Sequence, residues 1–172
     1  MSFTRRGPTL LQIFICFGGR EGENIGSRLR DFLRVEGIGA FLASPKSPDV
    51  PAGTDYKQFI EEKLLSSHLM IPICDSAIHK SQPARSEIVK AVQNNIPIIA
   101  FVRSNCRVPK EIRDRWVPYR FDPAYPESAF PQLLLGIYRR IDWQREQSED
   151  LSLRYPTGLP LFREYQKFLQ RR

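Results

Sequence analysis

IFICFGG, residues 13–19, is a continuous apolar run that ends at two glycines. A strand covered on both faces by helices has no polar side, so its sequence is apolar throughout. The run is too short to span a bilayer, which takes about 20 apolar residues. The basic, polar residues 1–8 precede it, and no small-residue cleavage site follows. We therefore predict a buried strand at Ile13–Phe17 rather than a signal peptide.

Further short apolar runs predict the other strands of a sheet. Pro72 costs the run that contains it one backbone hydrogen-bond donor. The predicted strands are Ile38–Ala43, Leu69–Cys74, Ile96–Val102 and, more weakly, Trp116–Phe121.

Helical spacing of apolar residues, together with start and stop signals, predicts helices between the strands. Residues 18–22 break the first strand, and Asn24 is predicted to cap a helix that Gly37 ends. The later helices are one opened by Thr54 and Asp55, one from near Pro83 to Asn94-Asn95, a short helix or turn at Val108–Arg115, and one capped by Ser128.

This alternation predicts one α/β domain over residues 10–145. The expected architecture is a flavodoxin-like five-stranded parallel sheet in the order 2-1-3-4-5, with helices on both faces. Ligands of such sheets bind beyond the carboxyl ends of the strands, near the point where the strand order reverses. We expect the loops after Phe17, Ala43 and Cys74 to surround one crevice.

Residues 146–172 differ in character from the domain. The segment Tyr155–Pro160 holds two prolines and a glycine and cannot continue a helix. Apolar residues then recur at helical spacing from Leu161 to Leu169. We predict a linker and a C-terminal amphipathic helix, which either packs back on the domain or docks on a partner protein.

The chain is basic, with 26 Lys and Arg against 19 Asp and Glu and a net charge of +7. Such a charge attracts anionic partners. The basic residues are scattered, however, and no Lys/Arg block alternates with aromatic residues as on a nucleic-acid-binding surface. We interpret the charge as a solvated basic face, and expect neither a nucleic-acid partner nor a membrane.

Cysteine and histidine positions bear on compartment and metal binding. Cys16, Cys74 and Cys106 form no CxxC spacing, and two of them lie in apolar runs, where a thiol behaves as a small hydrophobe. His68 and His79 form no HxxxH or HExxH pattern. We expect no disulfide framework and no metal site, and predict a cytoplasmic location.

Standard site motifs are absent. The glycines at 18, 19, 22 and 26 form neither GxGxxG nor a phosphate-binding GxxxxGK[ST] loop, and there is no GxSxG. Asp75 follows the third strand, where receiver domains keep their phospho-accepting aspartate. The acidic pair that such domains need after the first strand is missing, which excludes that class.

Glu87 is the candidate for chemistry. It lies in the first turns of the helix after the third strand, beside the expected crevice. Two interpretations are open from periodicity alone. An acidic side chain in a first turn complements the helix dipole, whereas a carboxylate at the mouth of a sheet can also take part in catalysis.

An ordered set of segments resembles the Toll/interleukin-receptor (TIR) family over roughly residues 10–142. Ile13–Phe17 resembles the family's "FISY" strand, and Gly37–Phe41 its "GhxhF" segment. Residues 51–53, with the following helix that ends at residues 64–67, resemble the BB loop and its helix.

The segment Ser81–Ile88 matches the spacing of the family's "SxWCxxEh" motif. Ser81 and Glu87 are in register with it, whereas Pro83 and Ala84 replace the usual Trp-Cys. The residues after Glu87, including 96–99, continue as in the enzymatic, prokaryotic-type members.

The resemblance implies an enzyme that cleaves the nicotinamide–ribose bond of NAD⁺. Its products would be nicotinamide and ADP-ribose or a cyclic ADP-ribose-type signal, in immune or antiphage defence. NAD⁺ is the substrate, and no separate cofactor is expected. Nicotinamide is cationic in NAD⁺ and leaves neutral, so no general acid is needed. A carboxylate at Glu87 can stabilise the oxocarbenium ion that develops on the ribose.

The resemblance also implies substrate contacts. The loop from residue 44 to residue 53 would act as a lid. The residues themselves leave other roles open: a core aromatic at 17, a solvated charge at 20 and a helix cap at 81. The expected substrate-binding residues are Phe17, Arg20, Ser44, Pro51, Gly53 and Ser81.

Two other functions are compatible with the same fold. Many TIR proteins act only as adaptors through TIR–TIR contacts and commonly lack the glutamate, so Glu87 favours the enzyme. In the family, the pocket is often completed by the BB loop of a neighbouring subunit, so the resemblance also implies self-association of this chain through TIR–TIR contacts. Nucleoside deoxyribosyltransferase-like enzymes use a carboxylate on this fold too, but their own motif is not found in the chain.

Overall fold

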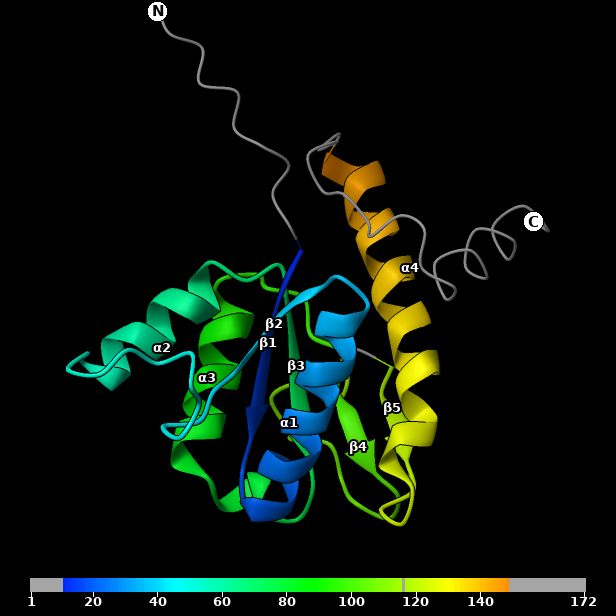
Figure 1. The fold of residues 1–172 in the computed structure, drawn as a ribbon. Coiled ribbons are helices and arrows are strands. Elements are labelled where there is room, and N and C mark those ends of the chain that lie inside the picture. Colours follow the sequence, from blue (N-terminus) through cyan, green and yellow to red (C-terminus); the bar gives the residue numbers. More distant parts are fainter. Residues whose placement is uncertain (1–10, 116, 149–172) are drawn as a thin grey trace, which may run out of the picture.

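Five parallel strands form the sheet, in the order β2-β1-β3-β4-β5. The computed structural model describes residues 11–115 and 117–148 (Figure 1). The fold class and strand order predicted from the sequence are confirmed. The strands are β1 (Gln12–Phe17), β2 (Gly39–Leu42), β3 (Leu69–Cys74), β4 (Phe101–Arg103) and β5 (Tyr119–Phe121).

Helices cover both faces of the sheet, as Figure 1 shows. Helices α1 (Arg20–Val35) and α4 (Phe130–Ser148) lie on one face, and α2 (Tyr56–Leu65) and α3 (Gln82–Gln93) on the other. Two short 3-10 helices, η1 (Ile78–Lys80) and η2 (Pro126–Ala129), precede α3 and α4.

The alternation of side chains along β1 divides the core into two layers. Ile13 and Ile15 pack under α1 and α4, whereas Phe14 and Cys16 pack under α2 and α3. All four are fully buried. Because β1 lies between β2 and β3, the chain leaves β1 toward one face and β3 toward the other. The strand order therefore reverses beside the carboxyl end of β1, the position where parallel sheets bind ligands.

Helix α1 begins earlier than the sequence predicts. It starts at Arg20 with Gly19 as its N-cap, so the expected cap, Asn24, lies inside the helix. The glycines after β1 form a tight turn rather than a loop. A Cβ on Gly18 would lie 2.2 Å from the Cα of Ile78, so the chain passes there too closely for any side chain. The two acidic residues of the first turn, Glu21 and Glu23, complement the helix dipole.

Strand β4 is shorter than the predicted Ile96–Val102, and Pro72 explains why. Met70 N donates to Pro97 O, and Ile99 N donates to Met70 O. The next donor from β3 in this parallel ladder would be residue 72, which has no N–H. Regular pairing resumes only at Ile73 with Phe101, and the residues before it form an isolated bridge at Met70 and Ile98.

The last domain helix is not capped by Ser128. That residue lies within η2, and its hydroxyl donates to the Tyr125 carbonyl at 2.7 Å.

Residues 108–115 were predicted to form a short helix or a turn, and they form a turn. Among the described residues, no helix is long and apolar enough to cross a bilayer. The predicted amphipathic helix near the C-terminus lies outside the described residues, and the predicted division of the chain near residue 146 stays a prediction.

Candidate active site between helices α2 and α3

Ser81 and Pro83 set the start of the helix that carries Glu87. Ser81 is the N-cap of α3, and its hydroxyl accepts a hydrogen bond from Ala84 N at 3.3 Å. Glu87 is the sixth residue of α3, in the second turn. Since the stabilisation of acidic side chains by the helix dipole is largely confined to the first turn, capping does not account for a glutamate at this position.

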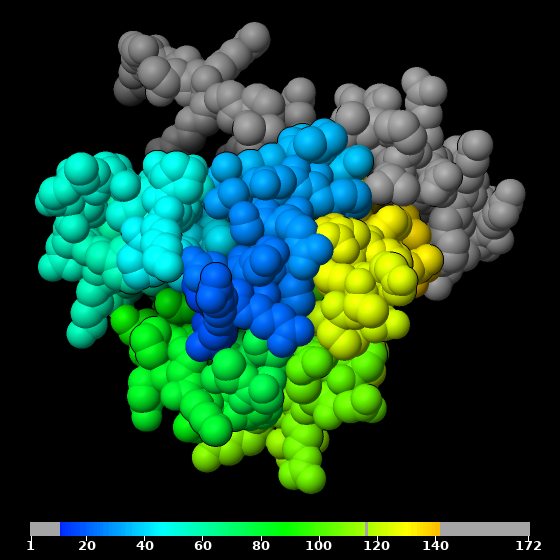
Figure 2. Space-filling view, turned by 60° about the horizontal axis from the view of Figure 1, so that its bottom comes forward, coloured from blue at the N-terminus to red at the C-terminus, as the bar shows by residue number. Residues whose placement is uncertain are grey.

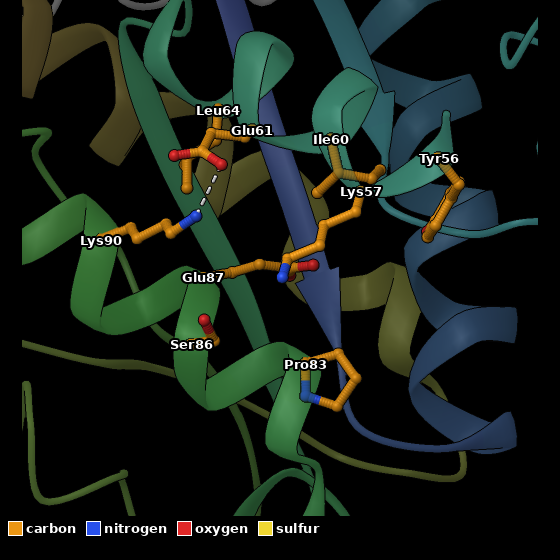
Figure 3. A pocket seen from close by; sticks show the side chains of 9 residues that line it. All are labelled: Tyr56, Lys57, Ile60, Glu61, Leu64, Pro83, Ser86, Glu87 and Lys90. Atoms are coloured by element: carbon orange, nitrogen blue, oxygen red, sulfur yellow. Dashed lines mark ion pairs between the residues drawn. The ribbon is translucent and has the colours of Figure 1, made fainter. Parts of the chain in front are cut away.

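Glu87 points into a cavity of about 280 Å³ between α2 and α3 (Figure 3). The cavity surface is mainly apolar. Helix α2 provides one wall, and the first three turns of α3 provide the other. The lining residues are Tyr56, Lys57, Ile60, Glu61 and Leu64 from α2, and Pro83, Ser86, Glu87 and Lys90 from α3.

The carboxyl group of Glu87 forms no hydrogen bond or ion pair with any other described residue. Burial raises its pKa from 4.5 to about 8, although the nearby charge of Lys90 opposes the shift. Lys90 itself is held elsewhere, because its Nζ lies 2.8 Å from Glu61 Oε2 in an ion pair that joins α3 to α2 (Figure 3). A partly buried carboxyl without a hydrogen-bond partner is costly, and perturbed carboxyls of this kind concentrate at functional sites.

Two neighbours of Glu87 keep their protons at neutral pH. Burial raises the pKa of the Cys16 thiol well above its usual range, and the charges of Glu87 and Cys74 add to this. Cys16 is therefore an inert core residue rather than a nucleophile. Burial, together with the charges of Glu87 and Glu23, raises the pKa of Tyr56 to about 12, so its hydroxyl remains available as a donor.

A second hollow lies close enough to Tyr56 for the charge of one of its lining residues to act on the tyrosine. Glu23, whose charge acts on Tyr56, lines an open hollow of about 380 Å³ between the start of α1 and residues 44–48. Arg20, Ser44 and Lys46 line the same hollow. The Ser44 hydroxyl donates to Glu23 Oε1 at 2.5 Å, which ties this loop to α1.

The structure thus distributes the predicted site residues over several places. Glu87 lines the cavity, Arg20 and Ser44 line the second hollow, and Ser81 caps α3. Phe17 packs on the opposite face of the sheet, with its Cβ 3.1 Å from the position that a Cβ on Gly22 would take.

The exposed residues Pro51 and Gly53 line neither hollow. Gly53 has a φ of +78° and nothing within 4 Å of its Cβ position. The ion pair of Arg34 with Asp49, 2.6 Å long, holds the same loop against α1.

Sequence reasoning missed Lys57, Glu61 and Lys90 as parts of the site. Tyr56 and Ile60, which are apolar residues at helical spacing, carry no site motif either. Lys57 and Glu61 are four residues apart on α2, which places them on one side of that helix. That this side meets α3 is a tertiary contact, which no spacing within either helix reveals. No group of three or more metal-ligating side chains occurs in the part of the chain that the structure describes.

The fold and the site together define a flavodoxin-like α/β domain with an unpartnered carboxyl in an apolar cavity beside the carboxyl ends of its strands. A family model described as "TIR domain" matches residues 13–149. The chain belongs to the TIR domain family.

Other comparisons give weaker likenesses. No curated protein shows significant sequence similarity to the chain. A 2-deoxyribosyltransferase from the psychrotolerant bacterium Bacillus psychrosaccharolyticus is 14% identical, with a TM-score of 0.46 over 63% of this chain and 85% of that chain. The TIR domains of the activated Roq1 resistosome, which directly recognises the pathogen effector XopQ, are 14% identical, with a TM-score of 0.49 over 94% and 98% of the two chains. Both TM-scores are below 0.5, so neither likeness adds to the family assignment.

Proposed function

We propose that this TIR domain is an NAD⁺ glycohydrolase that releases nicotinamide, with Glu87 as its catalytic carboxylate. The observation that carries the proposal is the carboxyl in the α2–α3 cavity, buried enough to raise its pKa to about 8 and without a hydrogen-bond partner among the described residues. A structural glutamate would be expected to have an ion pair or hydrogen bonds there. A carboxyl without them is free to interact with a ligand.

The chemistry follows from charge. NAD⁺ brings a pyridinium next to a carboxyl group that is otherwise mostly protonated at neutral pH. The pyridinium charge favours ionisation of Glu87, because an opposite charge within a few ångströms lowers a carboxyl pKa. As the bond breaks, positive charge moves from the pyridinium to the ribose, and the Glu87 carboxylate stabilises it in an apolar surrounding where such attraction is strong. The departing nicotinamide is neutral and needs no proton.

The two hollows suit the two halves of a dinucleotide. The cavity of about 280 Å³ is just below the roughly 300–1,000 Å³ typical of small-molecule sites, which suits one half of a dinucleotide. The nicotinamide riboside half would occupy it, with the Tyr56 hydroxyl as a donor at its edge. The phosphates would then extend toward Arg20 and Ser44 in the second hollow, and the loop that carries Pro51 and Gly53 would move as a lid. Contacts from Phe17 and Ser81 stay predictions.

The test is nicotinamide release by the purified chain, followed by mass analysis to distinguish linear from cyclic ADP-ribose. Glu87→Gln should abolish release, whereas Glu62→Gln, a matched change on the exposed face of α2, should not. Since the resemblance also implies self-association, the assay should cover a wide range of protein concentration. Release by Glu87→Gln at the wild-type rate would contradict the proposal. Wild-type protein that self-associates without consuming NAD⁺ would identify an adaptor instead.

A further inference from the structure

A basic depression lies beyond the carboxyl ends of β3 and β4, apart from both hollows described above. It consists of two adjoining hollows of about 270 Å³ and 400 Å³ that share His79 and Arg113. The segment of residues 76–85 borders it on one side and residues 105–113 on the other. Figure 2, in which the carboxyl ends of the strands are turned toward the viewer, shows these green and yellow-green regions in contact at the bottom of the view. We refer to the pair as the basic depression.

Positive charge is in excess at this surface. Arg85, Arg107, Lys110 and Arg113 line it, and Glu111 is the one acidic residue among the lining residues. Four cations against one carboxylate leave three positive charges, without counting His79. Burial alone would raise the pKa of Glu111, but the hydrogen bond and charge of Arg85 and the charge of Lys110 lower it below its usual value. Positive charge therefore dominates this surface.

Three side chains of the depression are held in position before any ligand arrives. Arg113 donates from Nε and one terminal nitrogen to the Val108 carbonyl, at 3.3 and 3.2 Å. His79 Nε2 lies 3.0 Å from the Arg107 carbonyl oxygen, which links η1 to the loop after β4. A terminal nitrogen of Arg85 forms an ion pair with Glu111 Oε1, at 2.8 Å. The Arg107 side chain forms no bond with another described residue, so it is free to reach a ligand. Groups held in place lose less entropy on binding.

We propose that the basic depression binds a small ligand that carries a pyrophosphate or longer phosphate chain. Each of the two adjoining hollows presents its own arginine or lysine and shares Arg113, an arrangement that suits two linked phosphates better than one. Arginine is also well matched to phosphate oxygens. No Phe, Tyr or Trp lines either hollow, and single-stranded nucleic acids are usually bound by stacking on such rings. The depression shares no lining residue with the Glu87 cavity, so this site is independent of the proposed NAD⁺ cleavage.

The test is isothermal titration of the full 172-residue chain with inorganic pyrophosphate at about 150 mM salt, where surface charges are already largely screened. Wild-type and Glu87→Gln proteins should bind it equally. Arg107→Ala should weaken binding about tenfold, the usual effect of losing one charge-assisted hydrogen bond. Adding Arg113→Ala should weaken it further. Arg107→Glu keeps the test open if the double variant does not fold, because the Arg107 side chain bonds to no other described residue.

A matched control separates this site from the hollow beside α1. Arg20→Ala with Lys46→Ala removes the same charge from that hollow and should leave pyrophosphate binding within about twofold of wild type. The proposal is overturned if wild type shows no saturable binding, if this control loses as much affinity as the Arg107 variants, or if Arg107→Glu binds normally. Binding of a short oligothymidylate but not of pyrophosphate would also overturn it, in favour of a nucleic-acid surface.

Discussion

Glu87 keeps its proton over a pH range in which the same residue in the unfolded chain is ionised. Its pKa is about 8 in the folded chain, against an ordinary value of 4.5. Below about pH 4.5 both states hold the proton, so the ionisation of Glu87 contributes no difference in stability. Between pH 4.5 and 8 the unfolded state releases the proton while the folded state retains it, so stability falls as the pH rises. Glutamine has nearly the same shape and never ionises, so Glu87→Gln should remove this loss.

The size of the effect follows from the shift. Each unit of pKa difference corresponds to about 1.4 kcal/mol. At pH 7, which is 2.5 pH units above the pKa of the unfolded state, ionisation stabilises the unfolded wild-type chain by about 3 kcal/mol. The Gln variant should therefore be more stable than wild type by that amount. Above pH 8 the difference should level off at about 5 kcal/mol, and near pH 4.5 it should almost vanish. For a chain of this length, 3 kcal/mol raises Tm by roughly 6–12 °C.

Urea unfolding at pH 5, 7 and 9, followed by circular dichroism, measures these differences. Glu62→Gln, on the exposed face of α2, is the control for loss of a carboxyl as such. The decisive quantity is the change in the stability difference with pH, rather than its value at one pH. A Gln variant as stable as wild type, or less stable, at pH 9 would refute the reasoning, since the carboxyl would then not be separated from water in the folded chain.

Three further predictions follow from the same geometry. First, kcat/KM for nicotinamide release should rise about tenfold per pH unit and level off near pH 8, because the ionised form of Glu87 is required. A flat profile between pH 6 and 9 would contradict this. Second, Glu61→Gln should release Lys90 toward Glu87 and move the midpoint of that profile to lower pH, whereas Lys90→Ala should move it to higher pH. Shifts in the same direction would show that the charge of Lys90 does not set the pKa of Glu87. Third, Gly18→Ala should destabilise the fold by about 3 kcal/mol or more in urea unfolding, because its Cβ meets the backbone of Ile78. Gly53→Ala, with open space around it but a positive φ, should cost only about 1 kcal/mol, and equal costs would show that the contact at Gly18 is unimportant.

Local signals in the sequence were sufficient for most of the fold. The apolar runs predicted the strands near β1, β2 and β3, because a strand buried on both faces has no polar side. Asp55 caps α2 as expected, with its carboxylate accepting a hydrogen bond from Gln58 N at 3.1 Å. Gly37 ends α1 with a φ of +77°, which glycine adopts without strain. These signals act between residues close in the chain, so the chain order alone contains them.

Two of the failures share one cause, which is contact between distant segments. The sequence predicts a loop at Gly18 and Gly19, because the close approach of this turn to Ile78 depends on how η1 packs. The effect of Pro72 on β4 appears only when the two strands lie side by side. Asn24 and Ser128 are good caps by composition, yet both helices begin elsewhere.

The sequence by itself determined the order of strands and helices, the buried run of β1 and the position of Glu87 near the start of α3. Only the tertiary structure decided that this glutamate faces α2, that Lys90 pairs with Glu61 instead of with it, and that apolar walls raise its pKa. The physical reason is distance along the chain. Periodicity specifies which side of a helix is apolar, whereas the field at a carboxyl depends on groups brought together from α2, α3 and β1 by packing.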